Sequence, residues 1–231
     1  MTVPHERSGA GAATATRALA IDVFSDVVCP WCYIGERRLA RGLELARAQQ
    51  PGLAVEQRWR PFQLRPEIPP EGESWQAFVR DKFGGEERAR AMFAHVTALG
   101  AAEGLTFRFD GVASAPNTAD AHRLILSAGP GREWVVALAL FRAYFAEGAN
   151  LNDREQLVAI AERAGLDARE ARALLDGDDG KAEVVRSQLE AGRLGIRGVP
   201  FYVIDGRLGV SGAQPPELFA RAVRQALEEA A

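Results

Sequence analysis

The two cysteines of this chain, Cys29 and Cys32, are separated by only two residues in the segment SDVVCPWCYIG. Cysteines at this spacing can close a short disulfide, form half of a metal site, or be two buried thiols that happen to be neighbours. The preceding segment, 18–24 (ALAIDVF), alternates in character and contains β-branched residues, which predicts a strand. The following segment, 36–47, has apolar residues at helical spacing. The pair is therefore expected where a strand gives way to a helix.

This position favours redox chemistry. Unpaired backbone N–H groups and the positive end of the helix dipole stabilise a thiolate at the first residue of a helix, which here is Cys29. Cys32 lies nearly one turn further on and is expected to be the more buried, resolving thiol. Cys29 would form a mixed disulfide with a substrate, and Cys32 would release it. Between them, Pro30 sets φ in the first helical turn, and Trp31 supplies apolar contact surface for a substrate.

Metal binding is the weaker interpretation of the cysteine pair. The chain has three histidines, His5, His95 and His122, and none is paired at ligand spacing, whereas a structural zinc site needs four ligands. We therefore expect no metal and no bound organic cofactor. Two reduced, buried thiols remain an alternative, although it requires the spacing and the strand-to-helix junction to coincide by chance.

Charge and hydrophobicity argue against a nucleic-acid-binding, membrane-spanning or secreted protein. The net charge of −3 over 231 residues gives no basic excess for nucleic acid. No stretch approaches the roughly 20 apolar residues of a membrane span, and the first 20 residues lack the apolar core of a secretory signal. We therefore expect a cytoplasmic protein without a membrane or nucleic-acid partner. Permanent structural disulfides are rare in the reducing cytosol, which again favours a catalytic pair.

A helical block interrupts the strand pattern in the middle of the chain. A second strand is expected at 53–59. Beyond it, Ser74, Asn117 and Asp167 each precede an amphipathic run and are predicted to be N-caps. Asp167 and Glu170 have the spacing of a capping box. Gly-rich joints separate the runs, so about a hundred residues are expected to form helical hairpins.

Strand patterns return near the C-terminus. Residues 199–204 (VPFYVI) precede the turn signal Asp-Gly, and 208–211 supply a second arm. An amphipathic helix is expected at 215–227. The order βαβ, helical block, ββα predicts an α/β protein with a thioredoxin-like fold and a large all-α insertion. The expected organisation is a disordered tail at 1–17, the first half of the thioredoxin-like domain at 18–72, the inserted helical domain at 73–192 and the second half at 193–231.

Two further residues are candidates for an auxiliary role. His122 lies in the helix after Asn117 and could approach the thiols from the inserted domain, to hold the Cys29 thiolate or move a proton. The alternative is a core histidine satisfied by a hydrogen bond. Asp26 follows the first strand, where a buried carboxylate could serve the proton of Cys32; a solvated or capping aspartate is the alternative.

Five motifs occur in an order that resembles a known family: SDVVCPWCYIG at 25–35, WRPFQLRP at 59–66, PNTADAHRL at 116–124, GVPFYVIDGR at 198–207 and VSGAQP at 210–215. Together they resemble the cytosolic FrnE-like branch of the DsbA family of thioredoxin-fold oxidoreductases. The resemblance implies dithiol–disulfide exchange and a cis Val199–Pro200 bond facing Cys29. Val199 and Pro200 would then form the turn on which a substrate docks.

The resemblance leaves the partner and the direction of electron flow open. Protein or small-molecule thiols and disulfides are the expected substrates, glutathione among them, and the chain would act as a monomer or a homodimer. The related 2-hydroxychromene-2-carboxylate isomerases and kappa-class glutathione transferases are the main rival class. They bind glutathione and typically have serine where this chain has Cys29. A non-catalytic, chaperone-like binding module is a third possibility.

Overall fold

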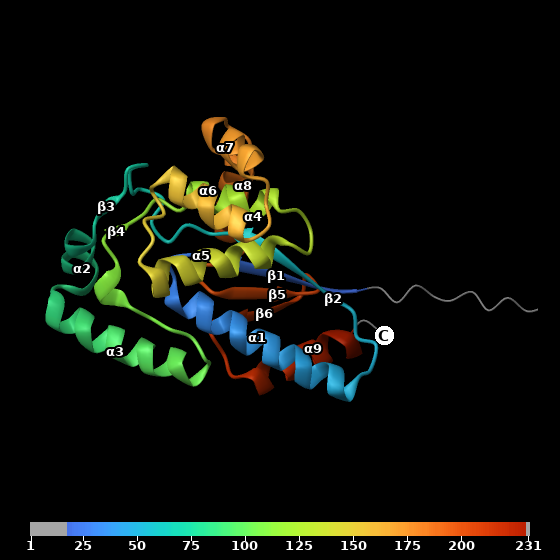
Figure 1. The fold of residues 1–231 in the computed structure, drawn as a ribbon. Coiled ribbons are helices and arrows are strands. Elements are labelled where there is room, and N and C mark those ends of the chain that lie inside the picture. Colours follow the sequence, from blue (N-terminus) through green and yellow to red (C-terminus); the bar gives the residue numbers. More distant parts are fainter. Residues whose placement is uncertain (1–17, 230–231) are drawn as a thin grey trace, which may run out of the picture.

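A four-stranded mixed sheet forms the centre of the computed structural model, which describes residues 18–229 (Figure 1). The tail predicted at 1–17 lies outside these residues. The strand order is β2 (Val55–Pro61), β1 (Leu19–Ser25), β5 (Phe201–Ile204), β6 (Leu208–Ser211). β1 is parallel to β2 and antiparallel to β5, and β5 is antiparallel to β6. The two ends of the chain therefore contribute to one sheet, as expected for a thioredoxin-like fold.

Helices cover both faces of this sheet. α1 (Pro30–Gln49) and α9 (Pro216–Glu228) lie side by side on one face (Figure 1). There Ile21 and Val23 of β1 share a core with Leu39 of α1 and Phe219 of α9. α8 (Lys181–Arg193) lies against the other face, where Phe24 packs in a smaller cluster with residues of α8 and β5. Successive strand residues thus face different helices, which fixes the register.

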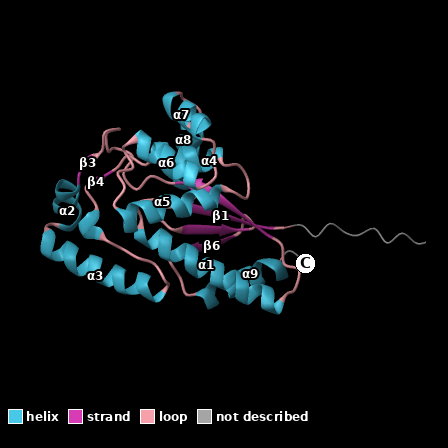
Figure 2. Ribbon diagram, viewed as in Figure 1, coloured by secondary structure: helices cyan, strands magenta, loops and turns pink. Residues whose placement is uncertain are grey.

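The helical block lies between β2 and β5 in the chain and contains α8 and six further helices among the described residues (Figure 2). These are α2 (Trp75–Phe83), α3 (Glu86–Ala102), α4 (Ala119–Ser127), α5 (Glu133–Glu147), α6 (Arg154–Arg163) and α7 (Ala168–Asp176). A short antiparallel pair, β3 (Glu73–Ser74) with β4 (Ser114–Ala115), and the 3₁₀ turn η1 (Phe109–Gly111) connect them. No helix within 18–229 is both long and apolar enough to cross a membrane.

The predicted helix caps are confirmed in two cases and corrected in one. Ser74 accepts a hydrogen bond from the N–H of Ala77, and Asp167 caps α7 by accepting the N–H groups of the second and third residues after it. The N-cap of α4 is Thr118 rather than Asn117. Asn117 still accepts the N–H of Ala119 at 3.0 Å, because its side chain reaches two residues forward in an Asx-type turn.

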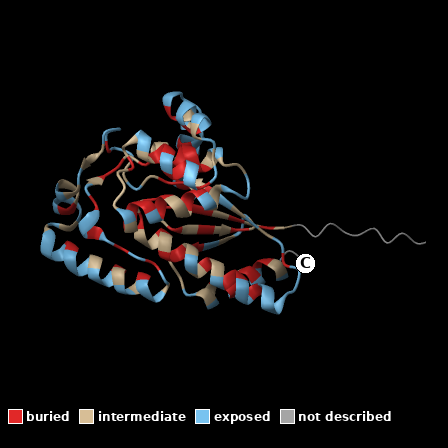
Figure 3. Ribbon diagram, in the orientation of Figure 1, coloured by how far each residue is buried: buried red, intermediate tan, exposed pale blue. Residues whose placement is uncertain are grey.

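The largest hydrophobic core among the described residues joins the helical block to the cysteine pair. Cys29 and Cys32 belong to the same buried cluster as Leu124 of α4 and Phe141 of α5. Tyr33, directly after the pair, stacks on Phe141 with ring centroids 5.0 Å apart. By contrast, α3 and α7 expose most of their surfaces (Figure 3). The inserted helices therefore bury the N-terminal end of α1.

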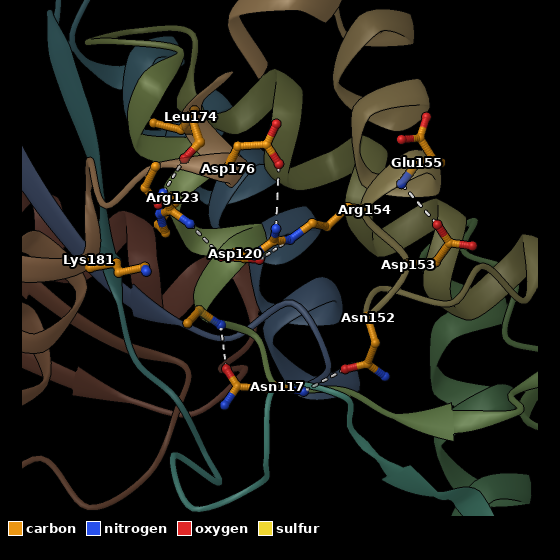
Figure 4. A network of polar contacts seen from close by, with 12 residues as sticks. Asn117, Asp120, Arg123, Asn152, Asp153, Arg154, Glu155, Leu174, Asp176 and Lys181 are labelled. Carbon is orange, nitrogen blue, oxygen red and sulfur yellow. Dashed lines mark hydrogen bonds and ion pairs between the residues drawn. The ribbon is translucent and has the colours of Figure 1, made fainter. Parts of the chain in front are cut away.

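A fully buried arginine holds α4 in place (Figure 4). Arg123 donates to the backbone carbonyls of Asp179 at 2.7 Å and Gly177 at 2.8 Å, and to that of Leu174. It also pairs with Asp120 at 2.6 Å. A buried guanidinium must be both paired and hydrogen-bonded, and these contacts meet that requirement. They tie α4 to the connection between α7 and α8, and so fix the neighbouring residues of α4.

Close packing under α1 gives a test of the fold. A Cβ added at Gly35 would overlap the buried hydroxyl oxygen of Tyr202 and lie 3.0 Å from Cγ of Pro200. We expect Gly35→Ala to lower the free energy of unfolding by about 1–3 kcal/mol, because overpacking outweighs the better helix propensity of alanine. Urea denaturation measures the change. Gly192→Ala on α8 is the control: its Cβ would meet nothing within 4 Å. It should leave stability unchanged or raise it, and equal losses in both variants would contradict the prediction.

Candidate active site

The cysteine pair lies where the sequence predicts it, at the N-terminal end of α1. Cys29 is the N-cap residue with an extended backbone, and Pro30 occupies the first helical position. The N–H of Cys29 donates to the Asp26 carbonyl at 3.0 Å, and the N–H of Cys32 donates to the Cys29 carbonyl at 3.0 Å. No side chain caps this helix end. Its remaining N–H groups and its dipole are therefore available to stabilise a thiolate on Cys29.

The environment of Cys32 keeps it protonated. Both cysteines are free thiols, and the exposed fraction is 4% for Cys29 and 2% for Cys32. Burial raises the pKa of the Cys32 thiol well above its usual value, and the hydrogen bond with Cys29 adds to the rise. Hydrogen bonds from the Ser25 side chain and the Asp26 backbone act in the opposite direction but do not cancel it. Cys32 therefore needs to lose its proton before it can act as a nucleophile.

The turn at Val199–Pro200, distant in the sequence, lies against Cys29. The Val199–Pro200 peptide bond is cis. The Cys29 Sγ lies 3.5 Å from the carbonyl oxygen of Val199, 170 positions away in the chain. This contact follows from the pairing of β1 with β5, in which Phe24 lies opposite Phe201. The end of β1 and the start of β5 thus lie at the same end of the sheet.

A cavity of about 320 Å³ opens beside Cys29. Trp31 and Val199 line it next to the thiol, and aromatic side chains of α2, α3 and η1 form much of the opposite wall. Its polar lining includes Asp26 and Lys82. An apolar cavity with a few polar groups beside a nucleophile is typical of a substrate site.

The side chains of the two auxiliary candidates, His122 and Asp26, lie against each other, and Asp26 reaches Cys32 only through its backbone. His122 is fully buried; its Nδ1 accepts a hydrogen bond from the Trp59 indole N–H at 3.1 Å. Its Nε2 lies 3.4 Å from Oδ1 of Asp26. The other carboxylate oxygen of Asp26 accepts the backbone N–H of Leu64 at 2.8 Å. The histidine thus reaches the active-site loop through Asp26.

Sequence reasoning did not single out Ser25, whose side chain is hydrogen-bonded to Cys32. Trp59 is placed by its sequence only at the end of the strand predicted at 53–59, although its indole N–H holds His122. Trp59 and His122 are 63 positions apart. A contact between residues so far apart leaves no local sequence pattern. A tryptophan in a predicted strand is explained equally well by packing in the core.

A sheet of this topology, with a dithiol pair at a helix N-terminus and a proline turn opposite, defines a thioredoxin-fold protein of the dithiol class. Residues 20–224 match the family described as the DSBA-like thioredoxin domain, and the chain belongs to this family. DsbA-type oxidoreductases are therefore its relatives, and the DsbA family and the α/β thioredoxin-like fold expected from the sequence are both confirmed.

Solved structures show the same relationship. A probable DsbA oxidoreductase from Streptomyces coelicolor is 37% identical, with a TM-score of 0.81, and the match covers 91% of each chain. A 2-hydroxychromene-2-carboxylate isomerase is 17% identical, with a TM-score of 0.64 over 91% of this chain and 97% of its own. The cytosolic disulfide reductase DsbM from Pseudomonas aeruginosa, solved with GSH, is 19% identical, with a TM-score of 0.59 over 91% and 100% of the two chains. The last two similarities show the fold alone.

The raised pKa of Cys32 predicts slow alkylation of this residue. In a Cys29→Ser variant at pH 8, native Cys32 should react with iodoacetamide more slowly than in urea, because burial raises its pKa and leaves a smaller fraction of thiolate at that pH. The native rate should keep rising with pH beyond the usual thiol pKa of about 8.5, whereas the rate in urea levels off. A native profile that levels off at the same pH as the unfolded one would show that restricted access, and not ionisation, slows the reaction.

Proposed function

We propose that this protein is a thiol–disulfide oxidoreductase in which Cys29 is the nucleophile and Cys32 the resolving thiol. The observation that carries the proposal is the position of the Cys29 sulfur, at the N-terminus of α1 and 3.5 Å from the Val199 carbonyl. Membership of the DSBA-like family supports it. The asymmetry of the two thiols supports the assignment of roles, because only Cys29 lines the cavity.

The exchange proceeds in two displacements. The Cys29 thiolate attacks one sulfur of a substrate disulfide, so that a Cys29–substrate bond forms, the substrate bond breaks and the electron pair leaves on the second sulfur. Cys32 then attacks the Cys29 sulfur and expels the remaining substrate thiolate. The substrate gains two electrons and two protons, and the cysteine pair loses them to become a disulfide. The reverse sequence oxidises a pair of substrate thiols.

The residues around the Cys29 thiol would bind the substrate. The backbone of Val199 and Pro200 directly precedes β5, at the end of the sheet where Cys29 lies, and we expect an extended substrate segment to pair with it there. Trp31 is half-buried on the cavity wall and offers apolar contact, and Pro30 shapes the turn beside it. The block of helices at 73–192 supplies the opposite wall.

Glutathione is a candidate small thiol partner, and the cytoplasm the candidate compartment. Both assignments draw support from the neighbour described as a cytosolic disulfide reductase with GSH. The rival isomerase or transferase activity is less well supported, because Cys29 replaces the serine typical of that class. A chaperone-like binding module would need neither thiol.

The two-displacement scheme predicts distinct outcomes for the two cysteines. Wild-type protein should reduce insulin and reshuffle a scrambled disulfide substrate, and Cys29→Ser should abolish both activities. Cys32→Ser should accumulate a mixed disulfide between Cys29 and the substrate, because the releasing thiol is absent. Mass spectrometry without reductant detects this adduct.

The same assay separates the alternatives. An inert wild type whose behaviour neither substitution alters would refute the oxidoreductase proposal. Glutathione-dependent isomerase or transferase turnover that survives both substitutions would instead favour the rival class. Thermal unfolding of each variant is the control for loss of fold.

A further inference from the structure

A second cleft, of about 610 Å³, lies between α1, α5 and α6, and α1 and α5 run side by side there (Figure 1). Its charged lining residues are Arg37, Arg142, Arg163 and Glu147, and we call it the basic cleft. Three guanidinium groups against one carboxylate leave two positive charges in excess. Among the described residues, none lines both the basic cleft and the cavity beside Cys29. The basic cleft is therefore a separate site.

The carboxylate of Glu147 orients two of the arginines without using up their donors. Its Oε1 lies 3.0 Å from Nε of Arg142, and its Oε2 lies 3.2 Å from a terminal nitrogen of Arg163. A guanidinium has five N–H donors in a planar fork, so most donors of both groups remain for another acceptor. Both side chains are exposed. An anion entering the basic cleft would therefore find these donors already held at its wall.

The third arginine has no partner. The guanidinium of Arg37 makes no ion pair or hydrogen bond with another residue of 18–229. By contrast, Arg38 and Arg41 on the same helix both pair with Glu103, at 2.7 and 2.8 Å. Glu36, next to Arg37 in the chain, is partly buried; burial raises the pKa of its carboxyl, and the charge of Arg37 opposes the rise. Like charges gathered in one cleft repel each other, and a bound anion would remove that repulsion.

Tyr33 adds a neutral donor to the wall of the basic cleft. Its ring is held by stacking on Phe141, with centroids 5.0 Å apart, and by an edge contact with Phe107 at 5.9 Å. Its hydroxyl makes no hydrogen bond with another described residue. Burial raises the pKa of this phenol, and the charges of Arg37 and Arg142 oppose the rise. The hydroxyl is therefore protonated at neutral pH and free to donate.

The remaining lining and the size of the basic cleft indicate what kind of anion fits. Leu105, Leu138 and Ala139 line it and offer apolar contact. Its volume lies within the range of about 300–1,000 Å³ that small-molecule sites occupy. A phosphate monoester carries a charge of about −1.5 to −2 at pH 7, which matches the excess of two positive charges better than a single carboxylate does. Its oxygens also fit the forked donors of arginine.

We propose that the basic cleft binds a phosphate monoester that carries a small apolar group. The phosphate would lie between Arg37, Arg142 and Arg163 and accept a hydrogen bond from the Tyr33 hydroxyl. The apolar group would pack against Leu138 and its apolar neighbours. This site is distinct from the cysteine pair, and its ligand takes no part in thiol–disulfide exchange.

Phenyl phosphate is a suitable probe, and isothermal titration calorimetry at low ionic strength measures its binding, because salt screens contacts between exposed charges. The wild type should bind it with a dissociation constant of about 1 mM or lower. Inorganic phosphate lacks the apolar group and phenol lacks the charge, so each should bind at least about tenfold more weakly. Absence of binding, or equal affinity for phenyl phosphate and inorganic phosphate, would overturn the proposal.

Two variants of the basic cleft locate the phosphate. Arg37→Gln should weaken the binding of phenyl phosphate about tenfold, because a charge-assisted hydrogen bond is lost. Tyr33→Phe should weaken it about threefold or more, because it removes only the hydroxyl donor. Arg47→Gln is the matched control: Arg47 is exposed on the same helix and does not line the basic cleft. Equal losses in Arg37→Gln and Arg47→Gln would show a general charge attraction and refute the site.

Alkylation of Cys29 with iodoacetamide separates the basic cleft from the cavity beside the thiol. The alkylated protein should bind phenyl phosphate as tightly as the untreated protein, since the two sites share no described lining residue. Loss of binding after alkylation would move the phosphate to the N-terminus of α1 and overturn the proposal. Circular dichroism of each variant checks the fold. Because binding is measured without a disulfide substrate, its failure and a failure of the exchange activity are separate results.

Discussion

Antiparallel pairing of β1 with β5 is the contact on which the site depends. It joins strands from opposite ends of the chain, and its register places Phe24 opposite Phe201. The residues that follow β1 and those that precede β5 then lie at the same end of the sheet, which brings Cys29 against Val199. A slip of one residue would exchange the two faces of β5, moving Tyr202 out of the core under α1. Because each face of the sheet has its own hydrophobic cluster, that slip would expose apolar surface on both sides.

The inserted helices affect the properties of the cysteine pair as well as the shape of the molecule. They share a hydrophobic cluster with Cys29 and Cys32, and Tyr33 stacks on Phe141 of α5 beside them. Burial is the main cause of the raised pKa of Cys32, so helices far away in sequence contribute to that rise. Cys29 keeps its place at the helix end and the cavity wall. One helix turn thus separates a sulfur that lines the cavity from a more deeply buried sulfur that does not.

Local patterns were sufficient for most of the fold. The period of two around β1 and β5, the Asp205-Gly206 turn and the caps at Ser74 and Asp167 are all encoded within a few residues, and the structure has them. The position of the cysteine pair between a strand and a helix could be predicted for the same reason. What could not be predicted depends on distant partners. The sequence around Arg123 does not indicate that this side chain is buried. The backbone carbonyls that accept its hydrogen bonds lie more than 50 positions away in the chain.

The contact of Trp59, His122 and Asp26 joins three separate parts of the molecule: β2, α4 and the loop that leads into α1. Each polar atom in it is buried, so a displaced α4 would leave an indole N–H and an imidazole without partners. Hydrogen bonds tolerate only a few tenths of an ångström of misplacement, which is tighter than the limit set by apolar packing. Arg123 anchors α4 from its other side by bonds of the same kind. The position of Asp26 in the cavity wall is therefore set by polar contacts with the insertion, whereas the position of Cys29 is set by the pairing of β1 with β5.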